Sequence, residues 1–155
     1  MSLNIVLLET FHVPAGHGRT NLVNLLGKNP QIVSELFRNL IYSIGSTYDN
    51  RDILYGAYRI DDPSAGVMGL PLVSLNEIGN ICAALSFLGR RSKLPFQVAG
   101  TNGRVKIFFG RFLFKGVEFV LVVERYNSHH VHCHALTLGE WTNGESSVLL
   151  KRIKG

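Results

Sequence analysis

Residues 104–125, with the sequence RVKIFFGRFLFKGVEFVLVVER, decide most of the fold. Branched and aromatic residues dominate this stretch, as is typical of β-strands. The pair Lys115-Gly116 can form the turn of a hairpin, and Gly110 predicts a β-bulge in the first strand. The unbroken apolar run of residues 120–123 predicts that the second strand is buried on both faces. The two predicted strands are residues 104–114 and 117–125.

Turn signals and alternating hydrophobicity extend this hairpin into a predicted strand meander. Asn102-Gly103 and Asn143-Gly144 are the dipeptides preferred in two-residue hairpin turns. Further strands are predicted at residues 3–13, 53–60, 130–138 and 146–153. The side chains expected on one face of the first of these are Leu3, Ile5, Leu7 and Phe11.

Three segments have helical patterns. Residues 29–45 carry an apolar stripe with the period of an α-helix, and a proline occupies the first helical position. A shorter helix is predicted at residues 20–27. The third, at residues 74–89, begins with Ser74 and Glu77 in the spacing of a capping box and ends at a glycine. These helices and strands predict an α+β fold with a mainly antiparallel sheet of five to seven strands and two or three helices on one face.

Size and composition fit one domain over residues 1–155. Apolar residues make up 46% of the chain and charged residues 17%, which excludes a disordered protein. No apolar run is long enough to cross a bilayer. Cys82 and Cys133 are too few for a disulfide framework, so we expect an intracellular protein that is not secreted. Whether these two cysteines pair with each other stays open.

Positive charge is concentrated in the second part of the chain. The net charge is +5, but residues 1–89 sum to −2 and residues 90–155 to +7. A field of one sign on one part of a small domain attracts polyanions, such as RNA, nucleoprotein or an anionic membrane surface. The candidate polyanion-binding residues are Arg90, Arg91, Lys93, Arg104, Lys106, Arg111, Lys151 and Arg152.

Four histidines within residues 129–134 form the most unusual cluster of side chains. His130 and His132 could act as general base and general acid in a metal-independent, toxin-like ribonuclease, with Arg125 and Trp141 completing the catalytic set. Alternatively, His130, His132 and His134 alternate along one face of a strand and could bind a metal ion, although no further ligand can be assigned. We favour a non-enzymatic function over both alternatives, and we expect no cofactor.

Residues 110–119, GRFLFKGVEF, resemble the Lys-Gly strand region of rhabdovirus matrix proteins. In that family an aliphatic or aromatic pair, Lys-Gly, a branched residue and Glu precede an apolar strand. The chain departs from the family pattern, because it has neither a lysine-rich N-terminal segment nor a Pro-Pro-x-Tyr or Pro-Thr-Ala-Pro motif. The resemblance implies a non-enzymatic structural protein that self-associates and bridges a nucleocapsid to a membrane. Its location would then be the host cytoplasm or the virion.

Overall fold

A hairpin of two long strands forms the centre of the sheet in the computed structural model. The structure describes residues 4–14, 52–60, 70–89, 105–127, 130–137 and 147–154. The hairpin consists of β3 (Val105–Phe114) and β4 (Val117–Asn127). Its turn has positive φ at both central residues, 52° at Lys115 and 78° at Gly116, as a type I′ turn requires. The predicted hairpin and its turn are confirmed.

The bulge predicted at Gly110 is also confirmed. The register between β3 and β4 shifts between Phe108 and Arg111, and Gly110 has a φ of 131°, a conformation that favours glycine. The predicted burial of residues 120–123 on both faces is confirmed as well, since all four side chains are at most 5% exposed.

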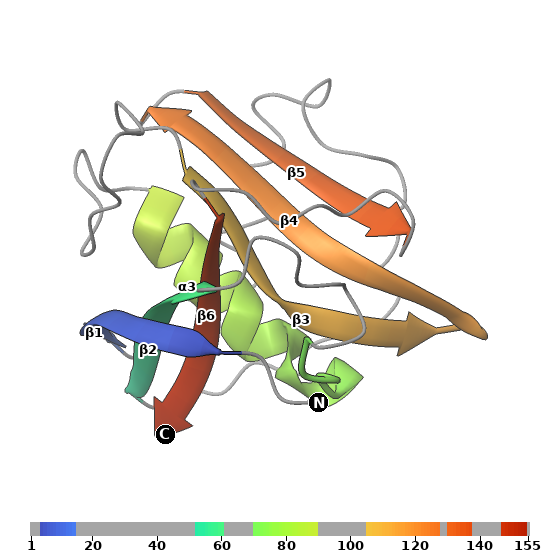
Figure 1. Ribbon diagram of the computed structural model, residues 1–155, viewed down its shortest axis with the longest axis horizontal. Helices are drawn as coiled ribbons and strands as arrows, with labels where there is room; N and C mark the ends of the chain where they lie inside the picture. The colour runs from blue at the N-terminus through green and yellow to red at the C-terminus, as the bar shows by residue number, and fades with distance from the viewer. Residues whose placement is uncertain are drawn as a thin grey trace.

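The described strands form one six-stranded sheet in the order β1-β2-β6-β3-β4-β5 (Figure 1). The four other strands are β1 (Ile5–Val13), β2 (Ile53–Ile60), β5 (His130–Thr137) and β6 (Ser147–Lys154). All neighbours pair antiparallel except β3 and β6, which run parallel. The sheet is therefore mixed.

The predicted α+β class, with two or three helices on an antiparallel meander, is wrong. The described residues are mostly sheet, and α3 (Ile78–Gly89) is the only α-helix among them. The predicted helices at residues 20–27 and 29–45 lie outside the described residues. The meander fails at β6, which does not extend the sheet beyond β5 but inserts between β2 and β3. Its residues Val148–Leu150 are at most 1% exposed, because strands flank them on both sides and apolar clusters cover both faces of the sheet.

The first strand also departs from its predicted face. Phe11 and Val13 are buried, but Leu7 is 52% exposed. The register between β1 and β2 shifts between Leu7 and Glu9. This irregularity breaks the simple alternation on which the prediction depended. Leu3 lies outside the described residues.

Two apolar clusters stabilise the two faces of the sheet. Helix α3 packs Ile78, Ile81 and Phe87 against one face, together with strand residues such as Tyr55 and Phe112. The cluster on the other face consists of Ile60, Leu70, Phe108, Val120, Val122 and Leu149. The helix follows the turn Leu75–Glu77, which Ser74 caps by accepting a hydrogen bond from the backbone N–H of Asn76 at 3.2 Å.

The sheet divides beyond the short parallel ladder. Strands β3 and β6 pair only at Lys106–Phe108 with Ser147–Leu149, and the two strands then diverge (Figure 1). The segment of residues 71–73 lies against β3 at this point, where Arg111 donates its backbone N–H to Pro71 and accepts one from Val73. The divergence creates the space in which the pocket described below lies.

Candidate functional site

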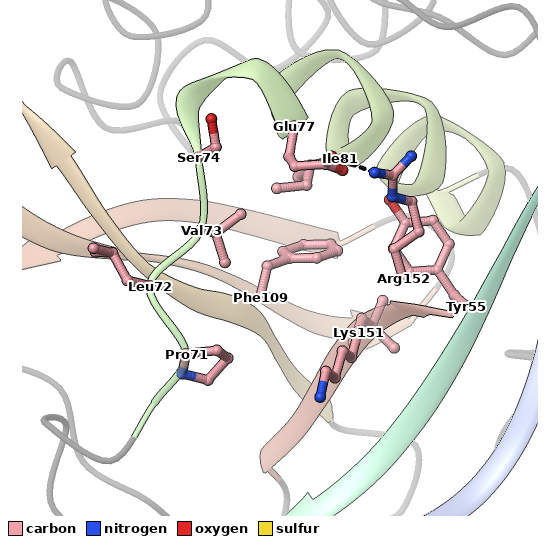
Figure 2. Close-up of a pocket in the computed structure, with 11 residues that line it drawn as sticks. Tyr55, Pro71, Leu72, Val73, Ser74, Glu77, Ile81, Phe109, Lys151 and Arg152 are labelled. Carbon is pink, nitrogen blue, oxygen red and sulfur yellow. Dashed lines mark hydrogen bonds and ion pairs between the residues drawn. The ribbon is translucent and has the colours of Figure 1, made fainter. Parts of the chain in front are cut away.

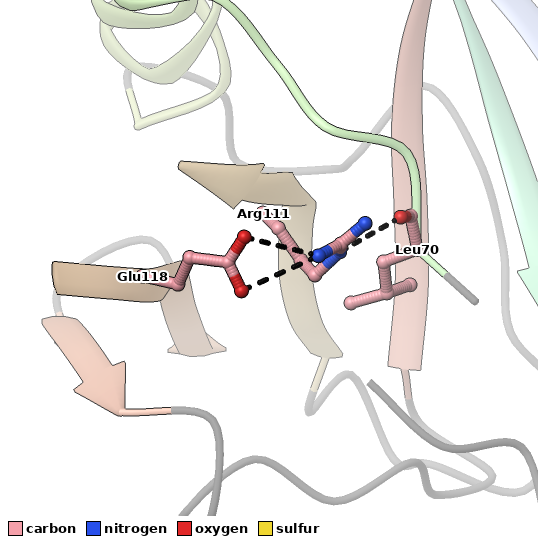
Figure 3. A network of polar contacts seen from close by, with 3 residues as sticks. All are labelled: Leu70, Arg111 and Glu118. Atoms are coloured by element: carbon pink, nitrogen blue, oxygen red, sulfur yellow. Dashed lines mark hydrogen bonds and ion pairs between the residues drawn. The ribbon is translucent and has the colours of Figure 1, made fainter. Parts of the chain in front are cut away.

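Arg111, a candidate polyanion-binding residue, is held by neighbouring groups of the fold (Figure 3). Its Nε donates to the carbonyl oxygen of Leu70 at 3.1 Å, and its Nη1 lies 3.2 Å from Oε1 of Glu118. The side chains of Arg111 and Glu118 are 14% and 30% exposed. A phosphate would have to compete with this carboxylate. Arg111 therefore has a structural role that joins the hairpin to the segment before α3.

The structural role of Arg111 gives a direct prediction. We expect Arg111→Ala to lower the free energy of unfolding by about 2 kcal/mol, because it leaves a partly buried carboxylate and a carbonyl without their donor. The control Lys151→Ala removes an exposed cation and should change stability by no more than about 0.5 kcal/mol. Urea unfolding followed by circular dichroism measures both. If Arg111→Ala left the stability unchanged and weakened binding to RNA, Arg111 would be a polyanion-binding residue and not a structural one.

Arg152 also has a carboxylate partner. Its Nη2 lies 2.5 Å from Oε1 of Glu77, and Nδ2 of the buried Asn80 donates to the other carboxylate oxygen at 3.2 Å. Glu77 is thus held from two sides. The sequence prediction of a capping box is correct in part: Ser74 caps the turn, whereas the carboxylate of Glu77 binds Arg152. Seventy-five residues separate the two charges, so no local pattern could reveal the pair.

The other candidate cations do not form a cluster within the described residues. Lys106 is half-buried and lies opposite Glu124 in the ladder of β3 and β4, whereas Lys151 is exposed on β6. Arg90, Arg91, Lys93 and Arg104 lie outside the described residues. The predicted polyanion surface stays a prediction that depends mainly on these four.

His130, His132 and His134 lie on β5, an edge strand of the described sheet, and His129 lies outside the described residues. In the ladder between β4 and β5, His132 lies opposite Glu124, His134 opposite Val122 and His130 opposite Asn127. Arg125 lies opposite Val131, in the row between those of His130 and His132. Trp141 lies outside the described residues. The ribonuclease and metal-site alternatives stay predictions, and no group of three metal-ligating side chains occurs among those the structure describes.

A pocket of about 250 Å³ lies where β3 and β6 diverge (Figure 2). Phe109 and Tyr55 form an aromatic wall, with ring centroids 6.3 Å apart in an edge-to-face arrangement. The apolar lining is completed by Pro71, Leu72, Val73, Ile81 and Leu150, and the polar lining by Ser74, Glu77, Lys151 and Arg152. No local pattern in the sequence indicates this pocket, because its lining comes from β2, β3, β6, α3 and the segment before α3.

The end of the β3–β4 hairpin exposes apolar side chains. Leu113 is 50% exposed and Val117 52%, one on each side of the turn. Lys115 lies between them, with Nζ 5.3 Å from the centroid of the Phe114 ring. The hairpin end projects to the right-hand limit of the view in Figure 1. The sequence contained a signal for this feature, since apolar residues flank Lys115-Gly116 where polar residues are usual.

Comparisons of the chain with protein-family models, curated proteins and solved structures gave no significant match. No helix in the described part of the chain is long and apolar enough to cross a membrane.

Proposed function

We propose that this chain is a non-enzymatic assembly protein that binds the anionic surface of a membrane and associates with further copies of itself. The observation that carries the proposal is the hairpin end, where exposed Leu113 and Val117 flank Lys115. The resemblance of residues 110–119 to rhabdovirus matrix proteins supports the same class of function. The proposal includes contact with RNA or nucleoprotein. The cations that would make this contact are Lys106, Lys151 and the four that lie outside the described residues, Arg90, Arg91, Lys93 and Arg104.

The chemistry of the hairpin end suits a lipid interface. Transfer of exposed apolar surface out of water is favourable by roughly 25 cal/mol per Å². A lysine close to an anionic leaflet adds about 1 kcal/mol of attraction. Leu113 pairs with Glu118 and Phe114 with Val117, so Leu113 and Val117 lie on opposite faces of the hairpin. Only end-on entry would bring both into contact with lipid.

The neighbouring charges favour this orientation. The one carboxylate in this part of the hairpin, Glu118, is paired with Arg111, so it opposes an anionic surface less than a free carboxylate would. No carboxylate partner of Lys115 occurs among the described residues, and its ammonium remains available to a headgroup. The tight turn holds these side chains at the end of two paired strands, which limits the entropy lost on binding.

Vesicle flotation tests the proposal. We expect the protein to float with phosphatidylcholine vesicles that contain about a third phosphatidylserine, and much less with pure phosphatidylcholine vesicles. The double variant Leu113→Ser with Val117→Ser should lower the partition coefficient on the order of tenfold, because two half-exposed apolar side chains are lost. Circular dichroism checks that the variant is folded.

A matched control locates the effect. Ile153 on β6 is 47% exposed, close to the 50% of Leu113, but lies away from the hairpin end. Leu113→Ser alone should weaken partition about threefold, whereas Ile153→Ser should leave it unchanged. Equal losses in both variants would contradict a specific role of the hairpin. Binding to single-stranded RNA without binding to either vesicle would overturn the lipid part of the proposal.

A further inference from the structure

The ring of Tyr58 lies along the sheet face opposite to the one that α3 covers. Tyr58 packs against the apolar cluster of that face, beside Leu149, which lies opposite it in the ladder of β2 and β6. Gly56 is the next residue of β2 on the same face. A Cβ atom on Gly56 would lie 2.7 Å from Cε2 and 2.9 Å from Cζ of the Tyr58 ring. The ring therefore leans along the strand over the glycine, which has no side chain to keep it away.

Exposed aliphatic side chains flank this ring on both neighbouring strands. Leu7 lies opposite Tyr58 on β1 and is 52% exposed. Ile153 on β6 is 47% exposed, and its Cδ1 would lie 2.9 Å from the same Cβ position on Gly56. Tyr58 itself is half-buried, and no other aromatic ring stacks on it among the described residues. We call Leu7, Tyr58 and Ile153 the Tyr58 platform.

Lys151 supplies a cation beside the Tyr58 platform. It lies opposite Gly56 in the ladder, so it shares the face of Tyr58, and its side chain points away from the aromatic wall of the pocket (Figure 2). It is exposed and has no carboxylate partner among the described residues. Glu9 is the one carboxylate in β1, β2 and β6, and it lies in a row of the face that α3 covers. Asp52 precedes β2, four residues from Gly56.

We propose that this face of β1, β2 and β6 binds single-stranded nucleic acid. One base would stack on the outer side of the Tyr58 ring, and a neighbouring phosphate would meet the ammonium of Lys151. An aromatic ring beside a cation suits unpaired bases, since every base has a flat π-face. A lipid surface suits the platform less, because the ring lies along the sheet and does not project from it. The inference deepens the RNA contact of the proposed function and rests on that contact, but not on membrane binding.

Titrations of the full chain with four probes test the site by fluorescence anisotropy and NMR. The probes are an oligouridine of about eight nucleotides and, at the same length, an oligothymidine, an abasic strand and a duplex. We expect both single strands to bind saturably and to shift the backbone amides of Gly56, Tyr58 and Lys151. The tighter of the two identifies the strand as RNA or DNA. The abasic strand and the duplex should bind at least about fivefold more weakly, because their bases are absent or paired.

Variants of Tyr58 test the stacking. Tyr58→Leu keeps an apolar side chain against the cluster but removes the ring, and it should weaken binding of the single strands about tenfold. Tyr58→Phe keeps the ring and should stay within about twofold of the original affinity. The matched control is Phe114→Leu, which removes a half-buried ring at the hairpin end and should leave binding unchanged. Circular dichroism checks that each variant is folded.

Lys151→Gln tests the phosphate contact at an exposed position, so this test stands even if Tyr58→Leu does not fold. It should weaken binding about two- to fivefold and lower the slope of log affinity against log salt concentration by about 0.7, because one phosphate contact is lost. Arg59→Gln removes a cation from the next residue after Tyr58, which is exposed on the opposite face, and should change affinity by less than about twofold.

The results that overturn this site differ from those that overturn the proposed function. Equal affinity for the abasic strand and the oligouridine would exclude stacking. Unchanged binding in both Tyr58→Leu and Lys151→Gln would exclude this face and leave the RNA contact to the other cations. Absence of saturable binding would overturn the site and the RNA contact together, while vesicle flotation would still decide the membrane function. If Tyr58→Leu lowered flotation and left nucleic-acid binding unchanged, this face would bind lipid and the proposal would be wrong.

Discussion

Gly110→Ala is expected to lower the free energy of unfolding by about 3 kcal/mol, through backbone strain and overpacking together. Gly110 has a φ of 131°, which side-chain-bearing residues rarely adopt. A Cβ atom there would lie 2.5 Å from the carbonyl oxygen of Pro71 and 2.8 Å from Cγ2 of Val73. That carbonyl accepts the backbone N–H of Arg111, so it cannot move away without loss of a hydrogen bond. Urea unfolding measures the change.

Gly116→Ala is the matched control for this prediction. Gly116 also has a positive φ, 78°, but a Cβ atom would meet nothing within 4 Å. Its replacement should therefore destabilise the protein by only about 1 kcal/mol, from the backbone conformation alone. Similar losses in both variants would show that the close approach of Pro71 to the bulge contributes nothing to stability.

Phe112→Ala is expected to have the largest effect on stability, a loss of about 4 kcal/mol. Phe112 and Phe119 pair directly across the hairpin, and their rings stack with centroids 5.9 Å apart. The two side chains are 0% and 1% exposed. Truncation of Phe112 would leave a cavity. Strands β3 and β4 cannot move to fill it, because backbone hydrogen bonds hold them together in one ladder.

Two companion variants test this explanation for Phe112 in the same unfolding experiment. Phe112→Leu keeps most of the volume and should lose only about 1.5 kcal/mol. Phe114→Ala removes the same ring from the same strand, but at a half-buried position, and should lose about 2 kcal/mol or less. A loss of stability for Phe114→Ala as large as that for Phe112→Ala would contradict this explanation, in which the buried pair of Phe112 and Phe119 contributes more to the core than Phe114 does.

Local patterns in the sequence were sufficient for the hairpin, for β2 and for the end of α3. Each of these depends on neighbouring residues, such as the positive φ of Lys115-Gly116 or the glycine, Gly89, at which the helix ends. The ion pair of Arg111 with Glu118 could have been found in the same way. A turn at residues 115–116 makes these residues diagonal neighbours across the ladder.

The order of the strands could not be derived from local patterns. Residues 146–153 were predicted as a strand, but their pattern did not show that this strand pairs with β2 on one side and β3 on the other. The same limit hid the pocket, which exists because β3 and β6 separate after three paired rows. Leu7 was misplaced because one register shift reverses the alternation of a strand.

The central position of β6 has a consequence for how the molecule assembles during synthesis. Strands β1 and β2 form one block and β3, β4 and β5 another, and β6 is the strand that joins them in the described sheet. Since β6 follows all the others along the chain, a nascent polypeptide can complete both blocks and still lack the connection between them. Closure of the sheet is therefore a late event that spans most of the sequence, which is the arrangement that makes folding slow.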